Sequence, residues 1–138
     1  MFGLDTDGDS VTDTLDAFPL DSTQSVDSDG DFYGDNPNGN NPDLFPYDFT
    51  QWNDTDLDGY GDNPDGNNSD AFPSISSQWS DLDGDGYGDN TNGELGDRYP
   101  NDPTQWVDSD FDGFGDNISG TNGDHCPDVN GNSIIDRI

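Results

Sequence analysis

Aspartates recur at alternate positions in the stretch DTDLDGYGDNPD, residues 54–65. Asp54, Asp56, Asp58, Asp62 and Asp65 occupy positions 1, 3, 5, 9 and 12 of this twelve-residue window. Such oxygens suit a hard cation, which takes six to eight oxygen ligands at about 2.3–2.6 Å. Without a cation, each pair of carboxylates about 4 Å apart would repel by on the order of 1 kcal/mol in water and by several in a partly dry site. The spacing therefore predicts a calcium-binding loop.

The same window recurs every 27 residues, opening at Asp27, Asp54, Asp81 and Asp108, and a further copy opens at Asp5. Fixed self-similarity of this length is typical of a linear array. We divide the chain into repeats 1 to 6, which are residues 1–26 (truncated), 27–53, 54–80, 81–107, 108–127 and 128–138 (incomplete). The predicted fold is a calcium-stabilised tandem repeat array of mostly irregular loops and turns, with at most short helical turns. We expect it to be elongated and to lack a single globular core.

The predicted side-chain ligands follow this register in every repeat. In repeats 1 and 2 they are Asp5, Asp7, Asp9, Asp13, Asp16, Asp27, Asp29, Asp31, Asp35, Asn38 and Asp43. In repeats 3 and 4 they are Asp54, Asp56, Asp58, Asp62, Asp65, Asp70, Asp81, Asp83, Asp85, Asp89, Asn92 and Asp97. In repeats 5 and 6 they are Asp108, Asp110, Asp112, Asp116, Asp124, Asp128, Asn130, Asn132 and Asp136. Position 7 supplies a backbone carbonyl in such loops, and here it is Val11, Tyr33, Tyr60, Tyr87 or Phe114.

A second acidic cluster follows the loop in repeats 2 to 5, where it begins at position 12 and closes on Asp43, Asp70, Asp97 or Asp124. The residue at position 12 could bridge two cations, although an Asn/Gly turn would explain the same residues. Repeat 1 lacks five residues here, so we expect it to hold one cation fewer. Two ions in each of repeats 2 to 5 and one in each of repeats 1 and 6 make about ten calcium ions, which would reduce the formal net charge from −30 to about −10.

The composition restricts the possible partners. Only 26% of the residues are hydrophobic, lysine is absent, and Arg98 and Arg137 are the only arginines. Such a chain should be disordered without calcium and ordered with it, because metal-binding free energy becomes folding free energy when no preformed site exists. The lack of a basic face argues against nucleic acid, and no apolar run is long enough to span a bilayer. Since weak calcium loops fill only at extracellular calcium levels, we expect an extracellular or cell-surface location.

Aromatic residues keep the same register as the acidic loops. Phe18, Phe45, Phe72 and Tyr99 each precede a proline, and Trp52, Trp79 and Trp106 are 27 residues apart. We expect each of these aromatics to pack with the tryptophan and the position-7 side chain of its repeat in a small satellite core. The segment 102–106 begins with an Asp-Pro pair that resembles a helix start, so we expect one short helical turn there.

The pattern DxDxDGxxDxxD, followed by D-x-[FC]-P, resembles the thrombospondin type 3 repeat over nearly the whole chain. This resemblance implies rows of calcium ions wrapped by irregular backbone, with Asp54, Asp56, Asp58, Asp62, Asp65 and their counterparts as ligands. Two departures are visible: the family's cysteines survive only at Cys126, and the uniform 27-residue spacing is closer to arrays in secreted prokaryotic surface proteins. EF-hand loops fit less well, because they require Glu at position 12 and flanking helices.

We expect a binding protein and not an enzyme, because the carboxylates are used identically in every repeat, whereas a catalytic pair needs two different environments. The leading hypothesis is an extracellular stalk or filament subunit that associates head to tail, since repeat 6 is incomplete and a loop already opens at Asp5. The alternatives are a calcium-dependent adhesion or carbohydrate-binding module and, third, a calcium store. Glycans could be attached at the sequons that begin with Asn53, Asn67 and Asn117.

Overall fold

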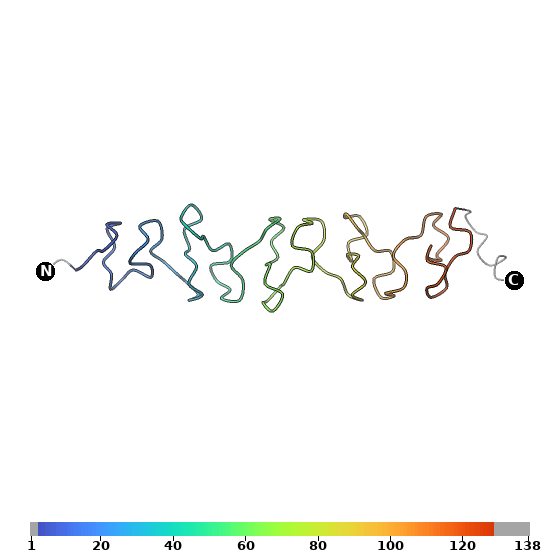
Figure 1. Cartoon of the computed structure of the whole chain (residues 1–138), viewed down its shortest axis with the longest axis horizontal. Coiled ribbons are helices and arrows are strands. Elements are labelled where there is room, and N and C mark those ends of the chain that lie inside the picture. Colours follow the sequence, from blue (N-terminus) through green and yellow to red (C-terminus); the bar gives the residue numbers. More distant parts are fainter. Residues whose placement is uncertain (1–2, 129–138) are drawn as a thin grey trace. The chain divides into compact units, whose positions relative to one another are not determined.

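The computed structural model describes residues 3–128, and their backbone is a succession of turns and bends (Figure 1). No α-helix or β-strand occurs within this range. Its only ladder-like pairings are isolated parallel bridges between Gly34 and Pro42, Gly61 and Ser69, and Gly88 and Gly96. The chain divides into two compact units, Met1–Pro73 and Ser74–Ile138. The predicted irregular repeat array is confirmed, whereas the expected ligands Asn130, Asn132 and Asp136 lie outside the described residues.

The acidic loops repeat one backbone conformation. Positions 4 and 6 are left-handed in all five described loops, with φ between 64° and 96°. Glycine adopts this region without a steric penalty, yet Ser10, Phe32, Leu57 and Phe111 also adopt it. The alternation of right-handed and left-handed residues curls the backbone around the carboxylate at position 1.

A hydrogen bond across its base closes each loop. The N–H of Asp62 donates to the carbonyl of Asn53, the residue before the loop, at 2.9 Å. The position-9 aspartates of the other described loops make the same bond at 2.8–2.9 Å. This backbone hydrogen bond joins the two ends of each loop.

Buried glutamines, and not apolar residues, form the interior. Within residues 3–128 no hydrophobic side chain is fully buried, whereas Gln78 has an exposed fraction of 0%. Its Nε2 donates to the carbonyls of Asn90 (2.8 Å) and Glu94 (2.9 Å), and its Oε1 accepts the N–H of Asn90 at 3.0 Å. Gln24, Gln51 and Gln105 make the same three bonds, each to the repeat that follows its own. The glutamine pins the turn that follows the acidic loop.

Glycine is required where this glutamine touches the backbone. A Cβ added at Gly88 would overlap Oε1 of Gln78, and one added at Gly93 would overlap the carbonyl of Ser77. Gly34, Gly61 and Gly115 meet their glutamines in the same way. The 27-residue period of the glycines and the glutamines is thus the signature of one interlocking contact.

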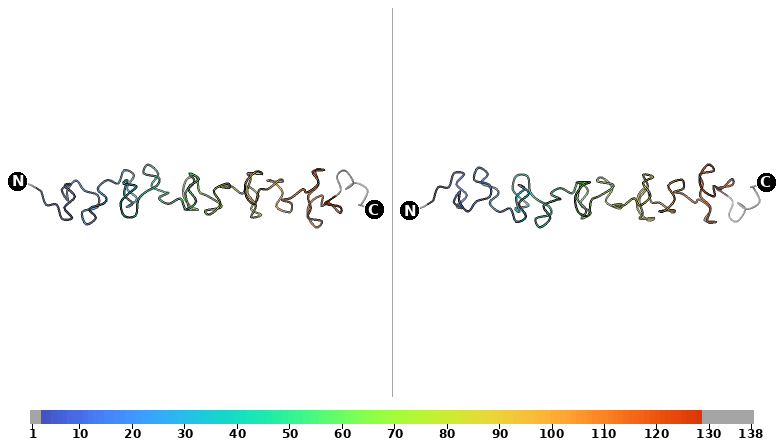
Figure 2. Two further views of the ribbon diagram at one scale, coloured as in Figure 1. Left: turned by 90° about the horizontal axis from the view of Figure 1, so that it is seen from above. Right: turned by 90° about the horizontal axis from the view of Figure 1, so that it is seen from below.

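Aromatic pairs form part of the expected satellite cores. Tyr33 stacks on Trp52 with ring centroids 5.2 Å apart and planes at 7°, and Tyr87 stacks on Trp106 at 5.0 Å and 6°. These side chains are only half-buried, so the pairs brace the loops without forming a dry core. Viewed from two further sides, the ribbon remains a chain of loops (Figure 2).

The segment 102–106 is a single hydrogen-bonded turn and not a helix. The N–H of Gln105 donates to the carbonyl of Asp102 at 2.9 Å, and Oδ1 of Asp102 accepts the N–H of Thr104 at 3.1 Å. Gln105, the last residue of this turn, is buried against the following repeat. No helix in the described part of the chain could cross a bilayer.

Candidate metal centres

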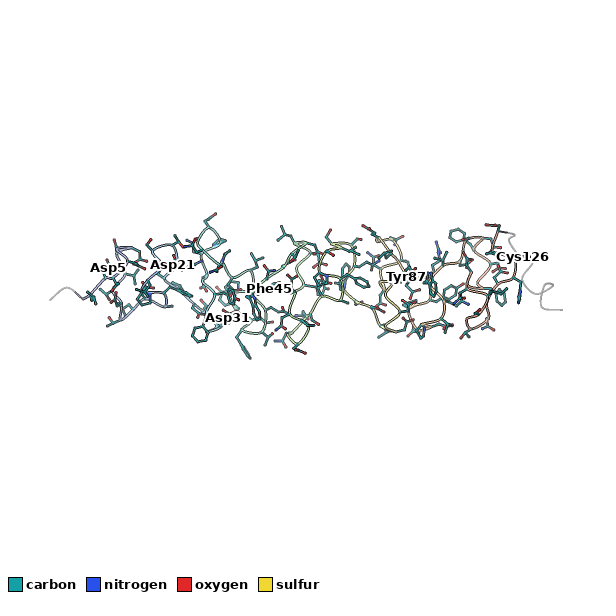
Figure 3. The ribbon with its side chains drawn as sticks, viewed as in Figure 1. Asp5, Asp21, Asp31, Phe45, Tyr87 and Cys126 are labelled. Atoms are coloured by element: carbon teal, nitrogen blue, oxygen red, sulfur yellow. The ribbon has the colours of Figure 1, made fainter. Side chains whose placement is uncertain are left out.

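Three carboxylates converge at the start of each loop. Their residues, at positions 1, 3 and 5, make five acidic triplets with oxygens within 4.8 Å of one another: Asp5–Asp7–Asp9, Asp27–Asp29–Asp31, Asp54–Asp56–Asp58, Asp81–Asp83–Asp85 and Asp108–Asp110–Asp112. Figure 3 labels Asp5 of the first triplet and Asp31 of the second. The structure therefore brings together the residues that the alternation predicted.

Backbone N–H groups orient these carboxylates. Asp54 accepts the N–H of Leu57 at 2.6 Å and that of Gly59 at 2.9 Å, one on each oxygen. Asp58 accepts the N–H of Tyr60 at 2.9 Å through Oδ1. Its Oδ2 is buried and has no hydrogen-bond partner in the described residues, as is true of Oδ2 in Asp7, Asp29, Asp31, Asp83 and Asp85. One oxygen fixes the side chain and the other is left for a ligand.

The aspartate at position 9 is held by position 2. In repeat 3, the N–H of Thr55 donates to Oδ1 of Asp62 at 3.1 Å, and the Thr55 hydroxyl donates to Oδ2 at 2.6 Å. Repeats 1, 2 and 5 use Thr6, Ser28 and Ser109 in the same way. In repeat 4, position 2 is Leu82, and the hydroxyl of Ser80 takes over the second bond to Asp89.

A further carboxylate is buried beside each triplet. We call these the closing aspartates: Asp16, Asp43, Asp70, Asp97 and Asp124. Asp70, Asp97 and Asp124 are only 4, 1 and 2% exposed. Oδ1 of each accepts the N–H two residues later at 2.7 Å, whereas Oδ2 has no hydrogen-bond partner in the described residues. A buried carboxylate oxygen without a donor is strongly unfavourable unless a cation or a proton neutralises it.

Loop carboxylates contribute to the raised pKa values of three closing aspartates. Burial raises the pKa of Asp43 to about 6, opposed by the N–H of Phe45 and helped by the charges of Asp31, Asp29 and Asp35. Burial likewise raises the pKa of Asp70, with Asp58, Asp56 and Asp62 as the repelling charges. In repeat 4 the pKa of Asp97 shifts in the same direction for the same causes. The closing aspartate thus belongs to the same charged cluster as positions 3, 5 and 9.

Position 12 is placed differently. Asn38, Asp65, Asn92 and Ser119 are all exposed. In repeat 3 this residue sits in a turn, where the N–H of Asp65 meets Oδ1 of Asn63 at 3.2 Å and Gly66 donates to the carbonyl of Asn63 at 3.0 Å. The Asn/Gly turn considered as the alternative is therefore present. That position 12 bridges two cations stays a prediction.

The other predicted sites are placed as follows. The N–H of each position-7 residue donates to the position-5 carboxylate, and a role for its carbonyl stays a prediction. Asp128 and His125 are exposed.

The three sequon asparagines all use their amides. Asn53 donates to Asp62 and to Thr55, exposed Asn67 donates to Asp48 at 3.1 Å, and half-buried Asn117 donates to the carbonyl of Thr104 at 2.8 Å.

The glutamines were the residues that sequence reasoning left without a role. Their 27-residue register was visible, but composition gives no reason to place an uncharged amide at the centre of an acidic repeat. The contact that explains them joins segments 12 and 16 residues apart. A glycine 10 residues after each glutamine was the available clue.

The donor set fits a hard divalent cation. Each site offers only oxygen atoms, several of them buried and without a hydrogen-bond donor, as calcium requires. No protein-family model matches the chain, and comparison with curated proteins finds no match. Repeated Asp-rich loops compatible with calcium binding are thus what the sequence and the structure establish together.

Proposed function

We propose that this chain is a calcium-ordered structural array, in which each acidic triplet and its closing aspartate hold calcium. The burial of Asp70, Asp97 and Asp124, each with one oxygen without a donor and each interacting with the charges of loop carboxylates, carries this proposal. At neutral pH such groups need a positive charge, and the described residues offer only Arg98 and the imidazole of His125. Calcium supplies that charge and orders the loops, because the binding free energy contributes to folding.

The way these repeats are stabilised supports a function as a stalk or filament element. Within the described residues the buried side chains are glutamines and aspartates, and the paired aromatics beside them are half-buried. An array of this kind transmits rigidity from one repeat to the next. We propose an extracellular location, a thrombospondin type 3-like calcium arrangement and binding rather than catalysis, all supported by the acidic pattern. Head-to-tail self-association belongs to the same proposal.

A second candidate is a calcium-dependent adhesion module. Tyr33 and Trp52 line a depression of about 360 Å³ together with Asn41, Pro42, Leu44 and Asn53. A flat aromatic face beside amide groups can bind a sugar ring. Glycan binding that disappears in Trp52→Ala, while calcium binding persists, would favour this candidate.

Calcium titration of the full chain by calorimetry and NMR tests the main proposal. We expect disorder without calcium and ordering at millimolar calcium. The molecular mass in solution should stay that of one chain unless the chains associate. The matched pair Asp70→Asn and Asp65→Asn probes repeat 3, since the first change removes a buried charge and the second an exposed one.

We expect Asp70→Asn to weaken calcium binding in repeat 3 by on the order of tenfold or more, and Asp65→Asn to weaken it less. A larger loss in Asp65→Asn would favour position 12 as the main ligand. The absence of any ordering by calcium would overturn the proposal.

A further inference from the structure

The first aspartate of the acidic triplet has two different environments. Asp54 in repeat 3 and Asp108 in repeat 5 are each only 8% exposed. Asp27 and Asp81, their counterparts in repeats 2 and 4, are half-buried, and Asp5 in repeat 1 is exposed. Because the five loops share one backbone conformation at positions 4 and 6, the difference lies with neighbouring side chains, and in repeat 5 one of these is Tyr99, which interacts with Asp108.

The residue at position 4 separates the two groups. It is Leu57 in repeat 3 and Phe111 in repeat 5, but Gly8, Gly30 and Gly84 in repeats 1, 2 and 4. Leu57 and Phe111 are left-handed, each with φ of 64°, and are 75% and 65% exposed. A bulky residue in this conformation is strained, and its exposure brings no burial in return. Such a residue at a position where glycine suffices points to a role outside stability.

Repeat 2 provides an internal control for bulk alone. Its loop, DSDGDFYGD, has its phenylalanine at position 6, whereas repeat 5, DSDFDGFGD, has one at position 4. Phe32 is 85% exposed, and Asp27 in its loop is half-buried. Both loops have Ser at position 2, so that position does not separate them. The first aspartate is therefore more buried in the loop with phenylalanine at position 4 than in the loop with phenylalanine at position 6.

In repeat 5 a residue of the preceding repeat contacts the side chain at position 4. The guanidinium of Arg98 lies 4.1 Å from the centroid of the Phe111 ring. The equivalent residue before repeat 3 is Leu44, and before repeat 2 it is Ala17. Large residues at this place thus accompany large residues at position 4, and a small one accompanies glycine.

We infer that repeats 3 and 5 contain shielded calcium sites and that repeats 1, 2 and 4 contain open ones, with the side chain at position 4 setting the class. This inference rests on the proposed calcium binding. A shielded first aspartate has already lost most of its water, so its attraction to the cation is less screened. Water also reaches a bound ion less easily, and an ion leaves a shielded site more slowly. The closing aspartates Asp70 and Asp124, buried with an oxygen that lacks a donor, complete both shielded sites.

Stopped-flow release of calcium from the full chain into excess chelator tests the inference. We expect two phases whose rate constants differ by roughly tenfold or more, with the slow phase arising from repeats 3 and 5. Leu57→Gly with Phe111→Gly should abolish the slow phase, because glycine is the native residue at this position in the open loops. Phe32→Gly is the matched control and should leave both phases unchanged. Gly84→Leu, where an added Cβ meets no atom within 4 Å, should transfer repeat 4 to the slow phase.

A purely structural role for position 4 predicts a different result: the double variant would lose resistance to urea while its calcium release rates stayed unchanged. The inference predicts faster calcium release from a double variant that is still ordered by calcium. A single release phase in the native chain, or a slow phase that survives the double substitution, overturns the inference and leaves calcium binding intact. A chain that binds no calcium overturns the proposed function as well, so the two failures are distinguishable.

Discussion

Replacing Gln78 by Ala should destabilise the fourth repeat more than any surface change. The substitution removes three hydrogen bonds of 2.8, 2.9 and 3.0 Å from a side chain with no exposed surface. At about 1 kcal/mol net for each bond, the loss is about 3 kcal/mol, and more if the abandoned Asn90 and Glu94 groups stay dry. Gln78→Glu keeps the shape but places a second carboxylate oxygen against two carbonyl oxygens. It should therefore cost at least as much at pH 7.

Local hydrogen exchange in saturating calcium measures this loss, because an array need not unfold in one step. The amides of Asn90 and Gly93 report the glutamine contact, and exposed Ser76 provides the control Ser76→Ala. Gly88→Ala alone should also be destabilising through overlap with Gln78. In the Gln78→Ala background that cost should largely vanish, which a double-mutant cycle detects. Protection in Gln78→Glu within about 0.5 kcal/mol of the native chain would refute the reasoning.

Three further predictions concern the loops. Tyr33→Ala should lose about 1 kcal/mol of ring stacking in addition to the loss of its buried area. It should also raise the calcium concentration needed for ordering, which near-ultraviolet circular dichroism can follow. Tyr47→Ala, which removes an exposed ring, is the control. Because the pKa of Asp43 is raised to about 6 in the folded chain without calcium, this group binds more protons there than in the unfolded chain between pH 3.8 and about 6, so its contribution to stability is greatest below this window and falls as the pH rises through it. Calcium binding needs the ionised carboxylate and should weaken below pH 6. Calcium titrations of the native chain and of Asp43→Asn at pH 5 and 7 measure this effect. The same pH dependence in both chains would contradict the prediction. Chelation of calcium should separate the Tyr87–Trp106 pair, and an unchanged near-ultraviolet signal after chelation would show that the pair does not depend on the ion.

The sequence by itself determined the repeat, the irregular fold and the acidic triplets. These features depend on neighbours in the chain: alternate aspartates and left-handed positions within nine residues bring Asp54, Asp56 and Asp58 together wherever the loop forms. The stacking of Tyr33 on Trp52 could also be expected, because both residues keep the 27-residue register in a chain that has few other apolar side chains to pack against. The short helical turn expected at 102–106 is present as one hydrogen-bonded turn and does not extend into a helix.

Only the tertiary structure decided which carboxylates lie beside the triplets and what fills the interior. Asp65 is nearer in sequence to the loop than Asp70, yet Asp65 is exposed and Asp70 is buried. The reason is that Gln51 forms hydrogen bonds with Asn63 and Asn67, which fix the turn between Asp65 and Asp70 so that the chain returns towards the loop. Ligand spacing along the chain is a local property, but the return of the chain depends on a contact between separate segments, and no local pattern specifies its geometry.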